Sequence, residues 1–223
     1  MTSTTRLTLN VDSHLSVSAI LVEPTRSCAC YVFAHGAGAG MNHAFMETAA
    51  AELATRSIAT LRFNFPYMEQ ASGRPDRPSI CHATVSAAVK AAASRLPDVP
   101  LVAGGKSFGG RMTSQAQAAG LLPRVHGLVF FGFPLHAAGK PDVIRAQHLF
   151  EVSVPLLFLQ GTRDRLADLD SLKSLAASLG PKATLFLVEE ADHSFHVPVR
   201  TGRDDRQVLT SIIDAFDSWL KAL

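Results

Sequence analysis

The most constraining feature of this chain is a serine set between glycines at a predicted turn from strand to helix. Residues 104–110 read Gly-Gly-Lys-Ser-Phe-Gly-Gly, directly after the apolar run 101–103 and directly before a stretch of good helix formers. So tight a turn requires glycine two positions before and two positions after the serine, because a Cβ there would collide with the backbone. Gly105, Ser107 and Gly109 meet this requirement. The pattern therefore predicts a serine nucleophile, exposed at the end of a strand.

The length and composition favour one domain that spans residues 1–223. Hydrophobic residues make up 47% of the chain, which is enough for one large core. The net charge of +2 is scattered along the chain, so neither nucleic acid nor a membrane surface is favoured as a partner. We expect a small-molecule substrate, no nucleic-acid or membrane partner, and either a monomer or a homodimer.

The N-terminal residues and the cysteines bear on the cellular compartment. Residues 1–10 are polar, and no window of the chain approaches eighteen apolar residues. Cys28, Cys30 and Cys81 are odd in number, and the first two lie too close together to form a useful disulfide. We therefore expect a soluble, cytoplasmic protein whose cysteines are reduced, buried thiols.

The rhythm of apolar residues changes along the chain. Partial alternation in residues 7–9 and 17–22 predicts an antiparallel hairpin. Short, nearly continuous apolar runs follow, separated by helical stretches, as is typical of parallel strands buried on both faces. The runs are residues 30–34, 58–63, 100–104, 125–131, 156–160 and 183–188. The order predicts an α/β fold with a mostly parallel sheet of eight strands and helices on both faces.

A glycine-rich loop follows the predicted strand 30–34. Residues 35–40 read His-Gly-Ala-Gly-Ala-Gly, so backbone N–H groups can turn inward without obstruction from side chains. We expect an oxyanion hole formed by the N–H groups of Phe108 and Ala37, with Gly38 as the second choice to Ala37. The alternative is a phosphate-binding loop, although its spacing matches neither a dinucleotide fingerprint nor a nucleotide-triphosphate loop.

Two further strand ends carry an acid and a base. Asp164 comes just after the run 156–160, where a carboxylate can orient a histidine; Asp168 is the alternative, and its other role is to start the next helix. His193 follows the last predicted strand and is the candidate base, with His196 as the alternative. The two histidines lack the helical spacing and the third ligand of a zinc site, so we expect no metal.

The chain order serine, acid, histidine joins these loops into a known pattern. The strings HGAGAG, GGKSFGGRM, GTRD and ADHSF resemble the alpha/beta-hydrolase superfamily, in a small branch of predicted hydrolases akin to dienelactone hydrolases. The resemblance covers residues 31–220. It implies the alpha/beta-hydrolase fold, with Ser107 as nucleophile, His193 as base, Asp164 as orienting acid and the Ala37 and Phe108 N–H groups as oxyanion donors.

Two departures from the family limit what the resemblance implies. Dienelactone hydrolases commonly have cysteine as nucleophile, whereas Ser107 occupies that position here, so their lactone substrate is not carried over. Larger relatives insert a helical cap after the sixth strand, but only residues 135–154 lie between the sixth and seventh predicted strands. We therefore expect an open site with a minimal cap or none.

The expected activity is hydrolysis of a carboxylic ester through an acyl-enzyme on Ser107, without a cofactor. A thioesterase or peptidase with the same triad remains an alternative, as does an interaction module that has the fold without the chemistry. Four apolar side chains are candidates for a substrate pocket: Phe65, Tyr67, Phe133 and Leu135. Basic residues near the strand ends suggest an anionic substrate, or else a solvated face; they are Arg62, Arg74, Arg77, Lys106, Arg111 and Arg163.

Overall fold

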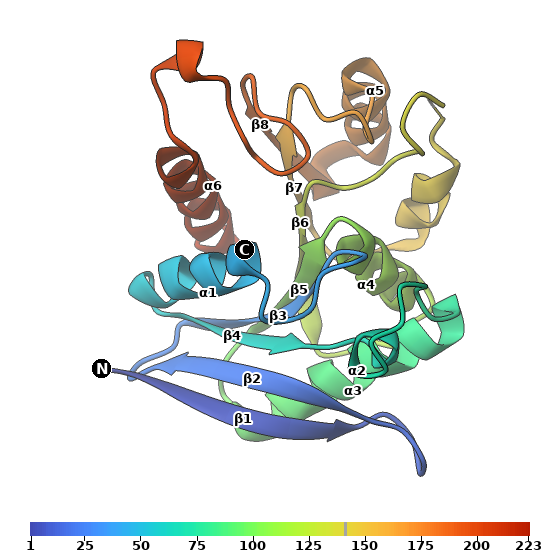
Figure 1. The fold of residues 1–223 in the computed structure, drawn as a ribbon, viewed down its shortest axis with the longest axis vertical. Coiled ribbons are helices and arrows are strands. Elements are labelled where there is room, and N and C mark those ends of the chain that lie inside the picture. The colour runs from blue at the N-terminus through green and yellow to red at the C-terminus, as the bar shows by residue number, and fades with distance from the viewer. Residues whose placement is uncertain (141) are drawn as a thin grey trace.

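A single twisted sheet organises the molecule in the computed structural model, which describes residues 1–140 and 142–223 (Figure 1). Within these residues eight strands lie in the order β1-β2-β4-β3-β5-β6-β7-β8. The β1–β2 and β2–β4 pairs are antiparallel, and every other neighbouring pair is parallel. The strands are β1 (Thr2–Asn10), β2 (Ser16–Pro24), β3 (Ala29–Ala34), β4 (Ile58–Phe63), β5 (Leu101–Lys106), β6 (Val125–Phe131), β7 (Leu156–Gly161) and β8 (Ala183–Val188). The predicted sheet is confirmed, with a longer hairpin at its start.

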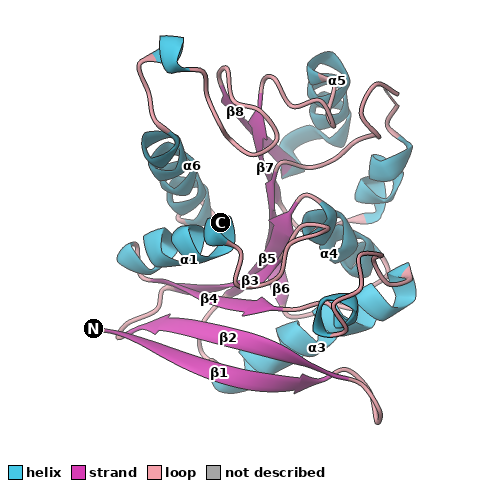
Figure 2. Cartoon of the chain, viewed as in Figure 1, coloured by secondary structure: helices cyan, strands magenta, loops and turns pink. Residues whose placement is uncertain are grey.

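Helices cover both faces of the sheet, as Figure 2 shows. On one face lie α1 (Ala44–Thr55) and α6 (Asp205–Leu220), and on the other lie α3 (Pro78–Arg95), α4 (Phe108–Ala118) and α5 (Leu169–Leu179). Short helices occur in the connections: α2 (Pro66–Glu69), η1 (Ile144–Glu151), η2 (Gly180–Lys182) and η3 (Val199–Thr201). None of the helices in the described part of the chain is long and apolar enough to cross a membrane.

The sheet separates two apolar clusters because successive side chains of a strand point to opposite faces. Tyr31 and Phe33 of β3 join the cluster under α1 and α6, where Phe216 packs edge-on against Tyr31 with ring centroids 5.1 Å apart. Val32 of the same strand joins the cluster under α3, α4 and α5, which includes Phe130. β3, β4 and β7 are buried along their whole length, whereas the edge strand β8 is partly exposed.

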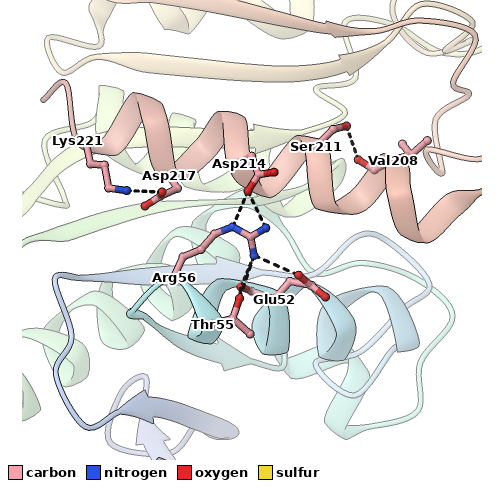
Figure 3. Close-up of polar contacts among 8 residues, drawn as sticks. All are labelled: Glu52, Thr55, Arg56, Val208, Ser211, Asp214, Asp217 and Lys221. Atoms are coloured by element: carbon pink, nitrogen blue, oxygen red, sulfur yellow. Dashed lines mark hydrogen bonds and ion pairs between the residues drawn. The ribbon is translucent and has the colours of Figure 1, made fainter. Parts of the chain in front are cut away.

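An ion pair joins the two helices on the first face (Figure 3). Arg56, at the C-terminal end of α1, donates from Nε and Nη2 to one carboxylate oxygen of Asp214 in α6, over 2.8 and 2.7 Å. Its Nη1 also lies 3.1 Å from Glu52, one helical turn earlier. Asp204 and Gln207 form a capping box at the start of α6, which satisfies N–H groups that the helix itself leaves free.

Two sequence predictions about connections and cysteines can be compared with the structure. β6 ends at Phe131 and β7 begins at Leu156, and the helix described between them, η1, packs beside α4. Residue 141, which lies in this predicted cap-free connection, is outside the described residues.

All three cysteines are free, but Cys28 is exposed, so the prediction of buried thiols is wrong for it. Cys28 lies in the β2–β3 connection, outside the buried apolar clusters, and such connections run over the surface.

Candidate active site

Ser107 occupies a strained turn between β5 and α4, as the glycine pattern predicts. Its φ of 50° and ψ of −113° lie in a region that residues with a Cβ rarely adopt. The neighbouring glycines leave no room for side chains: a Cβ on Gly105 would lie 2.4 Å from the Ala34 carbonyl oxygen, and one on Gly109 would lie 2.5 Å from it. The turn therefore presses against β3 and directs the serine beyond the carboxyl edge of the sheet.

The structure brings Ser107, His193 and Asp164 into one hydrogen-bonded chain. His193 Nε2 lies 2.8 Å from Ser107 Oγ, and His193 Nδ1 lies 2.6 Å from Asp164 Oδ2. The Asp164 side chain is fully buried and the His193 side chain is 25% exposed. Because a carboxylate accepts and does not donate, Nδ1 carries the proton of a neutral imidazole and Nε2 is left to accept from the serine.

Asp164 is itself held by groups on β7 and in its own turn. Gln160 Nε2 donates to Asp164 Oδ2 over 2.5 Å, and the Leu166 N–H donates to Oδ1 over 2.8 Å. The other side of the Gln160 amide accepts from the Phe133 N–H over 2.8 Å. The sequence analysis does not include Gln160 among the site residues. The feature that could have identified it is a polar residue at the end of an apolar strand, four positions before the acid.

The two alternatives for base and acid lie elsewhere. His196 Nδ1 lies 3.0 Å from both carboxylate oxygens of Asp205, and this pairing raises its pKa. Asp168 is the N-cap of α5, where it accepts from the Ser171 N–H over 2.9 Å. Neither residue contacts Ser107 in the described structure, so the geometry favours His193 and Asp164 over them.

His35 shapes the glycine-rich loop that the sequence associates with an oxyanion. Its Nδ1 donates to the Gly36 carbonyl over 2.8 Å and its Nε2 accepts from the Phe65 N–H over 3.0 Å. Burial lowers the pKa of His35 to about 4, so the ring is neutral at pH 7. Among the described residues, no protein acceptor takes the N–H of Ala37 or that of Phe108. Both groups are therefore free for a ligand.

A cavity of about 420 Å³ opens beside Ser107. Its wall combines backbone of the glycine-rich loop with apolar side chains and one ammonium group: it is lined by Gly36, Ala37, Ala39, His43, Phe45, Met46, Lys106, Ser107, Leu166, His193 and Ser194. The serine and the histidine thus face a space large enough for a small organic ligand, with an apolar side provided mainly by α1.

The residues that line this cavity differ from the four that the sequence predicts for a substrate pocket. Those four belong to the core under α3, α4 and α5 and are at most 1% exposed: Phe65, Tyr67, Phe133 and Leu135. Phe65 and Tyr67 pack edge-on against Phe108, with ring centroids 5.5 and 6.4 Å apart. Phe65 and Tyr67 thus pack against the start of α4. The cavity is instead lined by Phe45, Met46 and Leu166.

The basic residues near the strand ends are also dispersed. Of the six, Lys106 lines the cavity beside Ser107, and Arg74 and Arg77 line a separate surface cavity. Arg62 donates to the Met41 carbonyl over 2.8 Å, and Arg163 pairs with Glu190. The Arg111 guanidinium lies over the Phe108 ring, 5.9 Å from its centroid. The structure therefore does not collect these residues into one anion site. Nor do three or more histidine, cysteine or acidic side chains gather as metal ligands anywhere in residues 1–140 and 142–223.

Comparison with known proteins identifies one family and several solved structures of similar fold. A family model described as an alpha/beta hydrolase domain matches residues 27–221. A dienelactone hydrolase from Anabaena variabilis is 18% identical, with a TM-score of 0.79 over 99% of this chain and 98% of its own. An alpha/beta serine hydrolase without lid from Xanthomonas campestris is 22% identical, with a TM-score of 0.73 over 96% and 94%. The esterase domain of a Rhodothermus marinus protein is 16% identical, with a TM-score of 0.73 over 97% of both chains. At these identities the likeness to each structure is one of fold.

Proposed function

The chain belongs to the alpha/beta hydrolase domain family and has its fold, and on that premise we propose that it is a serine hydrolase that cleaves carboxylic esters. One observation carries the proposal: the hydrogen-bonded chain from Ser107 through His193 to Asp164 lies at the carboxyl edge of the sheet and borders a cavity. The similar esterase domain and lidless serine hydrolase are consistent with it.

The first step is attack by the Ser107 hydroxyl on the ester carbonyl. An alcohol is a poor nucleophile, so the proton must leave as the C–O bond forms, and His193 Nε2, 2.8 Å away, accepts it. Asp164 fixes the imidazole tautomer and stabilises the cation that results, because its carboxylate lies against the Nδ1–H. Gln160 and the Leu166 N–H keep that carboxylate in one orientation.

Negative charge then develops on the former carbonyl oxygen. The Phe108 N–H is the first of α4, so the positive end of the helix dipole lies at the same point. We assign the second donor to the Ala37 N–H in the wall of the cavity, held by the His35 contacts. One oxyanion donor contributes about 2.7 to 4 kcal/mol to transition-state stabilisation in comparable enzymes.

Collapse of the tetrahedral intermediate breaks the ester bond to the alcohol. His193 returns its proton to the leaving oxygen, and the acyl group stays on Ser107. A water molecule then attacks the acyl carbon as His193 accepts its proton, and a second collapse releases the acid and restores the serine. The side chains Phe45, Met46 and Leu166 favour an apolar acyl group of modest size in the cavity.

Hydrolysis of nitrophenyl esters of short and long acyl chains tests the proposal. Ser107→Ala should lose at least a thousandfold in kcat/KM, since it removes the nucleophile. Ser114→Ala is a matched control, because Ser114 Oγ also lies 2.7 Å from a histidine, His148, but away from the cavity. Activity that survives Ser107→Ala, or is absent from well-folded wild-type protein at every chain length, would contradict the proposal.

A further inference from the structure

Lys106 links the strand that carries the serine to the loop that carries the histidine. It is the last residue of β5 and directly precedes Ser107, and its Nζ donates to the backbone carbonyl oxygen of His193. The same ammonium lies over the ring of Phe195, 5.1 Å from the centroid, and 5.8 Å from that of Phe45. It therefore contacts the histidine loop at two points, one polar and one aromatic.

Burial of the Lys106 ammonium costs free energy unless its contacts compensate for the lost hydration. Burial lowers the pKa of Lys106 to about 8, against the opposing effect of the charges of Asp164 and Asp192. Neither carboxylate approaches to ion-pair distance within the described residues, so no direct salt bridge compensates the charge. A methionine of similar length would avoid this cost of desolvation. The lysine is thus not explained by stability alone.

Hydrogen bonds fix the start of the loop that holds His193 to the turn after β7: the Arg163 N–H donates to the Ala191 carbonyl oxygen, and the Glu190 N–H donates to Thr162 Oγ1. Glu190 and Phe195 have φ values of 62° and 67°, a region that side chains avoid, and no helix or strand is assigned between Val188 and η3. Asp192 Oδ1 accepts from the N–H groups of Ser194 and His196, which organises the loop internally. These bonds shape the turn but do not connect it to Ser107.

Gly132, the residue after β6, leaves the space in which this link forms. A Cβ there would lie 3.0 Å from Lys106 Nζ and 3.3 Å from His193 Nδ1. The ammonium of Lys106 and the imidazole of His193 therefore both lie against Gly132, where a larger residue would crowd them.

We propose that Lys106 is a positioning residue: its ammonium ties the His193 carbonyl to the end of β5 and so keeps the imidazole within hydrogen-bond distance of the Ser107 hydroxyl. The proposal rests on the proposed function, because positioning matters only if His193 acts as the base. Lys106 acts on the reaction through His193 and need not touch the substrate. A misplacement of about 1 Å in such a constellation costs up to about a hundredfold in rate.

The competing role for Lys106 is recognition of a substrate carboxylate, since its side chain lines the cavity. The two roles differ in their kinetic signature. Loss of positioning lowers kcat equally for neutral and anionic esters and leaves KM nearly unchanged, whereas loss of a carboxylate receptor raises KM for anionic esters alone. A nitrophenyl acetate and a nitrophenyl hemisuccinate provide the neutral and the anionic substrate.

The test compares Lys106→Met with wild-type protein in activity, stability and proton NMR. We expect kcat to fall about 10- to 100-fold for both esters with KM within twofold, and the melting temperature to stay level or rise. The downfield proton shared by His193 Nδ1 and Asp164, identified by its loss in His193→Ala, should broaden through exchange. Lys182→Met is the matched control. Lys182 Nζ also donates to backbone carbonyls, those of Leu149, Phe150 and Val152, but none of these residues lines the cavity, so kcat should not change.

Two results would overturn the proposal. One is a Lys106→Met variant with unchanged kcat and an unchanged downfield resonance; the other is a rise in KM confined to the anionic ester. The NMR comparison does not need turnover, so it tests the link even if wild-type protein hydrolyses no ester. Failure of the proposed function and failure of this inference are therefore distinguishable.

Discussion

Gln160 and His193 bind the same oxygen of Asp164, over 2.5 and 2.6 Å respectively. The amide of Gln160 is fully buried, and its carbonyl side accepts from the Phe133 N–H, which fixes which way the amide faces. Asp164 is therefore held from β7 while it holds the imidazole. The orientation of the proposed base depends on a side chain that contacts neither the serine nor the cavity.

Gln160→Met tests this dependence. The variant removes the donor to Asp164 and leaves the buried Phe133 N–H without its acceptor, which costs about 1 to 3 kcal/mol of stability. We expect kcat for a neutral ester to fall about tenfold, with little change in KM, because only the orientation of the acid is lost. Ester kinetics and urea denaturation measure the two effects. Unaltered kcat in a destabilised variant would show that Gln160 matters for folding alone.

The choice of acid is tested by two matched substitutions, Asp164→Asn and Asp168→Asn. The first removes the charge beside the His193 Nδ1–H and favours the wrong imidazole tautomer, so kcat should fall roughly a thousandfold or more. The second keeps an N-cap of similar quality at the start of α5, so activity and stability should stay near wild type. Steady-state kinetics decide between them, and the reverse pattern would make Asp168 the acid.

Much of this site can be predicted from sequence because its parts are local. The glycines around Ser107 are required by the backbone of one turn. Asp164 and His193 lie three and five residues after the ends of strands that their apolar runs reveal. Each position follows from neighbours in the chain. The parallel sheet then brings the ends of those strands to one edge.

The lining of the cavity beside Ser107 could not be predicted in the same way. An apolar residue after a strand can face a ligand or the core, and Phe65 and Phe133 face the core because they pack beneath Phe108 and Phe158. The actual wall includes Phe45 and Met46 of α1, a helix without any chemical motif. Which side chains line the cavity depends on how that helix docks on the sheet, and no local pattern carries this information.

The buried His148 should make the stability of the folded protein depend on pH. Burial lowers its pKa from 6.5 to about 4, and the nearby Arg111 and His82 charges act in the same direction. The unfolded chain then binds more protons than the folded one between these values, so this contribution to stability is complete above pH 6.5 and is lost as the pH falls toward 4.

His148→Gln removes this titration. We expect the free energy of unfolding of wild-type protein to decrease more steeply than that of the variant as the pH is lowered over that window. Urea denaturation at a series of pH values measures the difference. Parallel curves for the two proteins would contradict the assignment of a lowered pKa to His148.

The ion pair between α1 and α6 should contribute modestly to stability. The Asp214 side chain is 60% exposed and that of Arg56 is 16% exposed, so solvent screens the pair. We expect Asp214→Asn to cost less than about 1 kcal/mol, and Arg56→Met to cost more because it also loses the contacts with Glu52. Thermal unfolding at low and high salt provides the measurement. A larger loss for Asp214→Asn than for Arg56→Met would contradict this account.

The central claim is that Ser107 is a nucleophile activated by His193, and covalent labelling by a fluorophosphonate probe tests it most directly. Mass spectrometry of the labelled protein should find the adduct on Ser107, and Ser107→Ala and His193→Ala should both abolish rapid labelling while Ser114→Ala keeps it. An adduct on another residue, or no labelling of well-folded wild-type protein, would contradict the claim.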